Sequence, residues 1–155
     1  MFELKFVEER ITMRKKIIEI IAAILLLIIG GLIYLTFRTK SLVMFSWVEA
    51  IRLDGFVDAL RENKTTFKIP YFIKYCLPNA LWTLSYILMV DAIIRKDNNK
   101  LFWTIVLPII ASVLEIFQIW KIIPGTFDIA DLLCFLLPTI SYCVYYKIYY
   151  NEKVS

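Results

Sequence analysis

The sequence predicts an all-α integral membrane protein of one domain, 1–155, built as a bundle of four transmembrane helices. The first reason is composition: 60% of the 155 residues are hydrophobic, whereas a soluble domain averages about 45–50% apolar residues. The second is that these residues form uninterrupted runs of about 20, the length that a bilayer-crossing helix needs. The runs do not alternate as barrel strands do. Because hydrocarbon tolerates only internally paired backbones, the runs are expected to be helices.

The four expected spans are 17–37, 76–94, 101–120 and 128–150. The first span follows Arg14, Lys15 and Lys16, as the apolar part of a secretory signal would. It is long, lacks a small-residue cleavage pattern and precedes further apolar runs, so we interpret it as a retained anchor.

The distribution of Lys and Arg predicts the orientation. The short loop "RKDNNK" between the second and third spans is basic, whereas the loop "KIIPGTF" between the third and fourth is not. Because Lys and Arg favour the cytoplasmic side, both termini are expected in the cytoplasm of a multi-pass cell-membrane protein. The net charge of +4 is dispersed around the membrane ends, which argues against a nucleic-acid surface.

The loop 41–70 is expected to lie on the outer side as an amphipathic, interfacial helical segment. A turn at Asp54-Gly55 would divide it into two short helices. Its apolar residues at helical spacing are Leu42, Phe45, Val48, Ile51, Phe56, Val57 and Leu60. One interpretation, which we favour because amphipathicity alone specifies no ligand, is a structural lid over the bundle. The other is a surface that meets a lipid headgroup or a protein partner.

A set of polar residues is expected to meet just beneath the outer interface. Glu115 and Gln118 lie three apart near the outer end of the third span, and Asp128 and Asp131 lie three apart where the fourth begins. Residues three apart share one helical face, and the "IPGTF" turn folds one helix end beside the next. Asn79 lies near the outer end of the second span. Three spans therefore present polar groups at one level.

Each of these residues also has a purely structural interpretation. Asp128 and Asp131 can cap a helix N-terminus and interact favourably with its dipole, and for Asp128 alone we favour capping. Gln118 can bond to a neighbouring helix. Glu115 is harder to explain in this way, because a carboxylate within a span costs up to about 2.5–3.5 kcal/mol. Interfacial pairing with nearby Lys and Arg explains the remaining span acids, Glu19 and Asp91.

The chemistry open to this cluster is limited. Crowded carboxylates can provide a protonated acid beside an ionised base, which makes Glu115, Asp128 and Asp131 the candidate catalytic residues. The candidate substrate-binding residues are Asn79, Gln118 and Lys121. The same oxygens suit a hard cation such as Mg²⁺ or Ca²⁺, although no cofactor motif is evident. The chain has no His, and Cys76, Cys134 and Cys143 fall in spans without CxxC spacing, as core thiols do.

The segments "EIFQ" and "PGTFDIADLL" together resemble the VanZ-like family of small multi-span bacterial membrane proteins. The matching residues are Glu115, Gln118, Asp128 and Asp131, and the resemblance extends from about "LPNALW" onward. It implies a short helical bundle in the bacterial cell envelope, and the family's namesake is linked to glycopeptide resistance. Family members usually carry an Arg shortly before the Asp pair and an Asn one turn after it. Gly125 and Phe135 occupy these positions in this chain. If the Arg normally neutralises the acids, its absence either leaves Lys121 as a distant substitute or leaves one acid protonated.

Three functions are compatible with this pattern. The leading hypothesis is an envelope protein that binds or modifies the headgroup of a lipid or cell-wall precursor at the outer leaflet. The second is a non-catalytic membrane subunit that docks a larger protein partner. The third is proton or ion transport, which the confinement of the polar groups to one face disfavours.

Overall fold

The computed structural model describes residues 2–40, 43–62, 69–94, 99–123 and 126–154. Within these ranges all regular secondary structure is helical, and there are no strands. The expected all-α class is therefore confirmed. The helices are α1 (Phe2–Phe37), α2 (Val43–Ala50), α3 (Asp54–Glu62), α4 (Tyr71–Tyr75), α5 (Leu77–Ile93), α6 (Lys100–Phe117) and α7 (Ile129–Val154).

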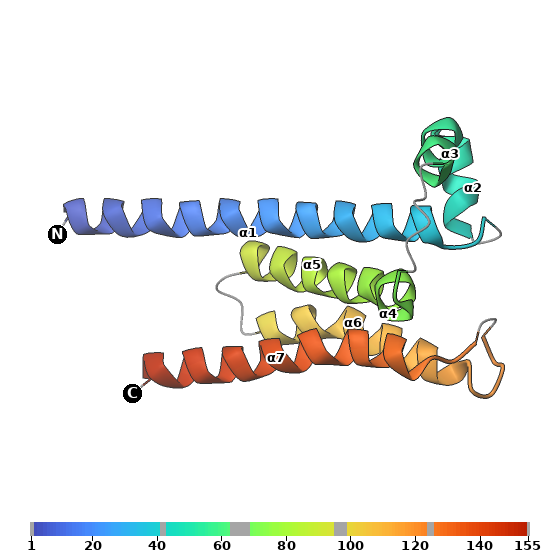
Figure 1. Cartoon of the computed structure of the whole chain (residues 1–155). Helices are drawn as coiled ribbons and strands as arrows, with labels where there is room; N and C mark the ends of the chain where they lie inside the picture. Colours follow the sequence, from blue (N-terminus) through green and yellow to red (C-terminus); the bar gives the residue numbers. More distant parts are fainter. Residues whose placement is uncertain (1, 41–42, 63–68, 95–98, 124–125, 155) are drawn as a thin grey trace.

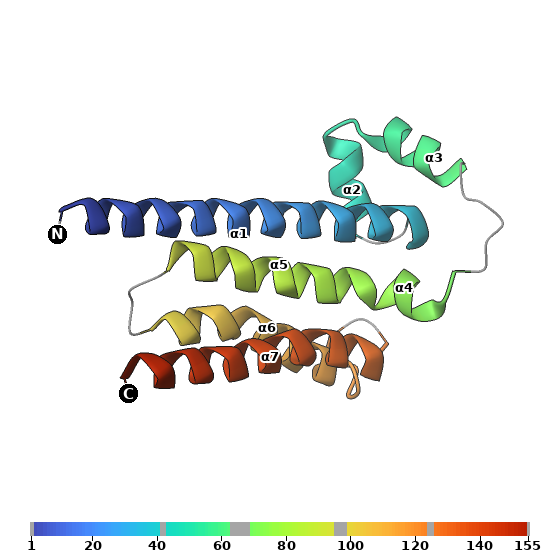
Figure 2. The same ribbon diagram turned by 60° about the vertical axis from the view of Figure 1, so that its left-hand side comes forward.

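Helices α1, α5, α6 and α7 run alternately in opposite directions along one axis. As a result, α1 begins and α7 ends at the same end of the molecule (Figures 1 and 2). Helix α5 lies in the middle of this arrangement, because it packs against α1 on one side and against α6 and α7 on the other. The short helices α2 and α3 lie beside the end of α1, on its far side from α5 (Figures 1 and 2).

Three helical segments are long and apolar enough to cross a membrane: Arg10–Phe37, Lys100–Phe117 and Ile129–Ile148. These are the features of a membrane protein. The second expected span, 76–94, coincides with the apolar helix α5, which has 17 residues and is shorter than the other three. A helix of this length extends about 26 Å at 1.5 Å per residue.

Two helices end in a left-handed residue, and both ends differ from the expected boundaries. Helix α2 closes at Arg52 (φ 56°), where Leu53 N–H donates to Val48 O at 3.0 Å. The expected break at Asp54-Gly55 was therefore wrong by about two residues. Asp54 instead opens α3, where its charge suits the helix dipole.

Helix α6 ends in the same way, at Lys121 (φ 55°), where Ile122 N–H donates to Phe117 O at 3.3 Å. This pattern of paired backbone bonds is a Schellman motif, which satisfies the last carbonyls of a helix. The α-helix proper stops at Phe117, three residues before the expected end of the third span at 120. Gln118 is consequently a helix-end residue rather than part of a helical face.

Small residues bring α1 and α5 close together. Gly30 lies against the indole of Trp82, and a Cβ added at Gly30 would come within 2.7 Å of Trp82 Nε1. One turn further along, the buried Ser85 hydroxyl donates to the carbonyl of Ala23 at 2.7 Å. Close backbone approach at small residues and hydroxyl bonds across helices are the usual means by which membrane helices associate.

Near the end of α5, Asp91 links this helix to α6 and α7. Its carboxylate accepts a hydrogen bond from the Tyr142 hydroxyl of α7 and pairs with the Lys100 ammonium of α6 at 2.7 Å. The expected charge pairing of Asp91 is confirmed with this lysine, while the expected partners Arg95 and Lys96 lie outside the described residues. Glu19 pairs with Lys15 at 3.8 Å, also as expected.

The short helices α2 and α3 pack against the end of α1. Phe45, Val48 and Val57 form a small buried core against Tyr34 and Leu35. The pair therefore flanks α1 and does not form a lid over the bundle, because its apolar residues find their partners on α1.

The guanidinium of Arg61 holds the same junction. It donates to the carbonyls of Leu35 at 2.7 Å and Arg38 at 2.9 Å. A charged donor at the last carbonyls of a helix satisfies groups that have no partner within the helix. The α2–α3 segment thereby stabilises the position of Arg38, which belongs to the site described next.

Candidate functional site

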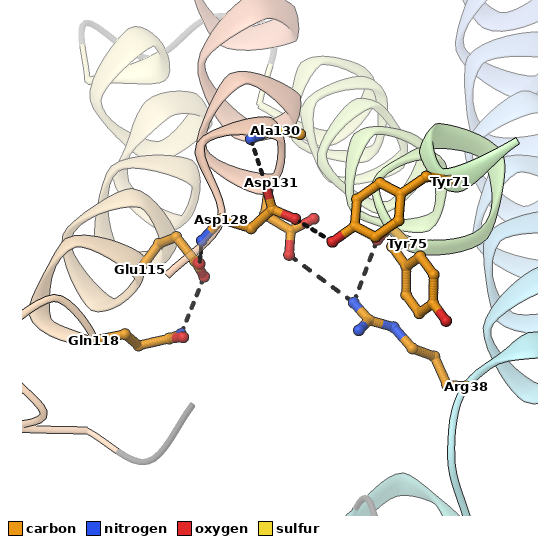
Figure 3. A network of polar contacts seen from close by, with 8 residues as sticks. All are labelled: Arg38, Tyr71, Tyr75, Glu115, Gln118, Asp128, Ala130 and Asp131. Carbon is orange, nitrogen blue, oxygen red and sulfur yellow. Dashed lines mark hydrogen bonds and ion pairs between the residues drawn. The ribbon is translucent and has the colours of Figure 1, made fainter. Parts of the chain in front are cut away.

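A connected group of polar side chains lies at the end of the bundle where α6 meets α7 (Figure 3). Four elements supply it: the ends of α1 and α6, the start of α7, and α4. Its members are Arg38, Tyr71, Glu115, Gln118, Asp128 and Asp131. Glu115, Gln118, Asp128 and Asp131 therefore lie near one another at this end of the bundle, as expected.

Glu115 is the innermost member, with only 8% of its surface exposed. Its Oε1 accepts the backbone N–H of Asp128 at 3.0 Å, and its Oε2 accepts the side-chain amide of Gln118 at 3.0 Å. Through its bond to the Asp128 N–H, Glu115 links the end of α6 to the start of α7.

Asp128 immediately precedes α7 and caps it. Its Oδ1 accepts the backbone N–H of Ala130 at 2.9 Å, and its Oδ2 accepts the hydroxyl of Tyr71 at 2.5 Å. The predicted capping role is thus confirmed, and the bond to Tyr71 was not foreseen.

These two bonds also set the protonation of the pair. The Tyr71 hydroxyl, followed by the Ala130 N–H, lowers the pKa of Asp128 below its ordinary value. The same bond raises the pKa of Tyr71 to about 12. At neutral pH, Asp128 is therefore an ionised acceptor and Tyr71 a neutral donor. Asp128 is poorly suited to act as a general acid, because that role needs a pKa near the operating pH.

Asp131 faces Arg38, but their contact is incomplete. Arg38 Nη2 lies 3.9 Å from Asp131 Oδ2, and it also donates to the carbonyl of Tyr75 at 3.3 Å. The guanidinium lies 5.0 Å from the centre of the Tyr75 ring. Two atoms at this contact, Arg38 Nε and Asp131 Oδ1, are buried and have no hydrogen-bond partner among the described residues.

The other two residues predicted to bind substrate have different positions. Asn79, near the start of α5, approaches the carboxyl group of Asp131, so it adjoins the site. Lys121 is exposed, and its backbone terminates α6. Within the part of the chain that the structure describes, the Lys121 ammonium forms no ion pair with the three carboxylates, which gives no support to its predicted role as their counter-charge. Gly125 lies outside the described residues.

The carboxylates of Glu115, Asp128 and Asp131 contact separate partners (Figure 3). Consistent with this, no group of three acidic or thiol side chains positioned to hold a metal ion occurs among the described residues. Cys76 and Cys134 are buried, and Cys143 is half-buried. All three are free thiols, as the sequence predicted.

Sequence reasoning missed Arg38 and Tyr71. Both lie close to expected spans on the expected outer side, but the acid that each one contacts is far away in the sequence. Asp131 is far along the chain from Arg38, and Asp128 is 57 residues from Tyr71. The only available signal was their expected position: an Arg directly after the first expected span and a Tyr shortly before the second are both expected at the outer interface, where the acids are also expected.

The fold and this cluster together define a helical membrane protein with a polar, partly buried site at one end of its bundle. A comparison with protein-family models found no match, and comparisons with curated proteins and with solved structures found none either.

Proposed function

We propose that the chain crosses the membrane four times, with both termini in the cytoplasm and the polar site at the outer leaflet. The alternating directions of α1, α5, α6 and α7 support this topology, as does the apolar character of α5. The basic loop between α5 and α6 supports the orientation.

The function that the site supports best is binding of a lipid headgroup, or of the headgroup of a lipid-linked cell-wall precursor, at the outer leaflet. The observation that carries it is the incomplete contact of Arg38 with Asp131. A buried donor and a buried acceptor without partners are costly, at about 1–3 kcal/mol each, and a polar separation above about 3.5 Å commonly has a bridging group between its ends. The side chains of Arg38 and Asp131 keep 25% and 14% of their surface exposed, and Arg38 Nη2 and Asp131 Oδ2 are 3.9 Å apart. A headgroup with a phosphate oxygen for the guanidinium and a hydroxyl or ammonium for the carboxylate bridges this separation.

Binding is favoured over modification by the state of the carboxylates. Glu115 is occupied by two hydrogen bonds, and Asp128 is held ionised by Tyr71. Neither is arranged as a proton donor. Glu115 and Asp128 therefore serve to position α7, while Arg38 and Asp131 contact the ligand.

We also propose that the chain belongs with the VanZ-like family in the envelope of a bacterium. The residues that carry the resemblance, Glu115, Gln118, Asp128 and Asp131, all belong to this one cluster. Arg38 supplies a guanidinium to Asp131 from α1, which offsets the absence of the family's Arg in the segment before the Asp pair.

Lipid selectivity in nanodiscs tests the binding proposal. Phosphatidylethanolamine and phosphatidylglycerol carry a headgroup donor, whereas phosphatidylcholine does not. Native mass spectrometry of protein released from mixed nanodiscs should show the first two retained in preference to phosphatidylcholine. In Asp131→Asn the preference should fall. In Arg38→Gln, retention of all three should weaken by about tenfold or more, because a hydrogen bond to a charged group contributes about 1.5–3 kcal/mol.

Glu19→Gln is the control, since it removes an acid of α1 that pairs with Lys15 at the other end of the bundle. It should behave as the wild type does. Equal retention of the three lipids by the wild-type protein would refute the proposal.

The second candidate function, a subunit that docks a protein partner, is favoured by the α2–α3 segment. Trp47, Ile51 and Phe56 expose 66%, 64% and 54% of their surface there. Purification in mild detergent would then recover a stoichiometric partner that is lost in Trp47→Ser. A monomer recovered from native membranes would argue against this function.

A further inference from the structure

An open groove of about 640 Å³ lies between α5 and α7. Its walls are almost wholly apolar, with Ala80 and Leu84 on α5 facing Leu133 and Leu137 on α7. Leu133 and Leu137 keep 47% and 59% of their surface exposed. Since both helices are apolar and lie within the expected spans, the groove opens onto the hydrocarbon of the bilayer.

The groove exists because the residues facing each other near one end are small. Ala80 and Ala130 contribute almost no bulk there, so the two helices leave a channel where larger side chains would interlock. Its volume falls in the range of about 300–1,000 Å³ that ligand sites usually have.

One end of the groove adjoins the polar site. Phe72 and Ala130 line this end. Phe72 follows Tyr71 in α4, and Ala130 lies between Asp128 and Asp131 at the start of α7. A polar site and an apolar groove that meet in this way match the two parts of a single amphiphile.

The groove is also long. Along α7 its lining extends from Ala130 to Tyr145, which is about 22 Å at 1.5 Å per residue. The hydrocarbon core of a bilayer is about 30 Å thick, so one leaflet contributes about 15 Å. A chain that follows the whole groove therefore passes the midplane.

We propose that this groove binds the hydrocarbon chain of the lipid whose headgroup lies at Arg38 and Asp131, and that it selects a chain longer than one leaflet. The inference rests on the proposed function, because it assigns the lipid class that the headgroup site takes. The polar site provides the headgroup contacts, and the groove provides discrimination by chain length.

A series of alkyl phosphates tests the groove separately from the headgroup site. Decyl, tetradecyl and octadecyl phosphate share one headgroup and differ only in chain length. Each is added to the full-length protein in phosphatidylcholine nanodiscs, and the fraction of protein that retains it is measured by native mass spectrometry. The wild-type protein should retain the longer chains increasingly well.

Leu137→Trp places bulk in the groove, and Ile140→Trp is its matched control. Ile140 lies one turn further along α7, has a similar exposed fraction of 55%, and does not line the groove. Leu137→Trp should abolish the dependence on chain length while still retaining decyl phosphate, and Ile140→Trp should preserve the dependence. Because both positions face lipid, both variants should fold, and circular dichroism verifies that they do.

The outcomes separate the two proposals. If the headgroup site is wrong, Arg38→Gln will leave the retention of every chain length unchanged. If the groove is wrong, Leu137→Trp and Ile140→Trp will show the same dependence on chain length as the wild-type protein.

Discussion

Asp128 shows how one residue can connect three elements of this fold. Its backbone N–H donates to Glu115 of α6, its Oδ1 caps α7, and its Oδ2 accepts the hydroxyl of Tyr71 in α4. The two bonds that Asp128 accepts have a charged acceptor, which makes them stronger than neutral bonds. The position of α7 at the polar site therefore depends on the hydrogen bonds of two carboxyl groups, those of Asp128 and Glu115.

The bond between Tyr71 and Asp128 predicts a pH dependence. Because the folded-state pKa of Asp128 is lowered, its contribution to stability is present above the ordinary value of 3.8 and is lost as the pH falls through the lower folded value. The folded-state pKa of Tyr71 is raised, so its contribution is present below the ordinary value of 10.0 and is lost as the pH rises toward about 12.

Ultraviolet titration of the tyrosines, compared between the wild-type protein and Tyr71→Phe, measures this shift. The difference between the two curves should show one tyrosine that ionises near pH 12, and Asp128→Asn should move that ionisation toward 10. If the difference curve is already centred near 10 in the wild-type protein, the hydrogen bond is absent.

Substitutions of Glu115 should lower the stability of the protein in graded steps. Glu115→Leu leaves the Asp128 N–H and the Gln118 amide without their acceptor, which should lower the free energy of unfolding by about 1–3 kcal/mol. Glu115→Gln keeps one acceptor oxygen and should cost less. Hydrogen exchange at the Asp128 amide reports the effect directly. It should accelerate in the order wild type, Glu115→Gln, Glu115→Leu, and an unchanged rate in Glu115→Leu would show that this carboxylate does not hold the turn.

At the scale of elements, the contact of α1 with α5 depends on Gly30. Gly30→Val places side-chain atoms against Trp82 and should destabilise the protein by about 1–3 kcal/mol, as overpacking usually does. Gly31 is the matched control, because a Cβ there meets nothing within 4 Å. Thermal unfolding in detergent compares the two variants. Equal destabilisation by Gly30→Val and Gly31→Val would implicate helix propensity rather than the contact.

Element positions were predictable from the sequence, whereas several boundaries were not. The apolar runs located α1, α5, α6 and α7 because the bilayer requires about 20 residues per crossing. The ends of α2 and α6 were missed because Arg52 and Lys121 adopt left-handed conformations, which a non-glycine residue rarely does. The helical start of α1 was missed because its charged first residues continue the helix without an apolar signal.

Substitution of Lys121 tests whether its left-handed conformation explains the end of α6. A left-handed conformation costs a non-glycine residue about 1–2 kcal/mol, so Lys121→Gly should leave stability unchanged or raise it. Lipid retention should stay at the wild-type level, since the structure assigns Lys121 to the end of α6. Weaker retention in Lys121→Gly, with stability preserved, would restore the headgroup role that the sequence suggested.

At the scale of the whole molecule, the site was only partly predictable. Glu115, Gln118, Asp128 and Asp131 are joined by one short turn, so their proximity follows from local sequence. Arg38 reaches Asp131 only because α1 packs on α5 and α5 packs on α7. No local pattern encodes this packing, and it rests in part on small residues such as Gly30 that carry no charge signal.

The topology of the whole chain depends on whether α5 crosses the membrane. Three apolar helices alone would place the α5–α6 junction and the α2–α3 segment on the same side, whereas four crossings separate them. Single cysteines at Arg52, Asn99 and Lys121, in a background with Cys76, Cys134 and Cys143 replaced by Ala, distinguish the two cases. All three test positions are exposed.

A membrane-impermeant thiol reagent added to intact cells should label Arg52→Cys and Lys121→Cys. It should label Asn99→Cys only after the cells are permeabilised, because the basic loop beside Asn99 favours the cytoplasmic side. Labelling of Asn99→Cys in intact cells, together with Arg52→Cys, would mean that α5 does not cross. The carboxylate site would then adjoin only three membrane-crossing helices. The groove between α5 and α7 would no longer face hydrocarbon along its length.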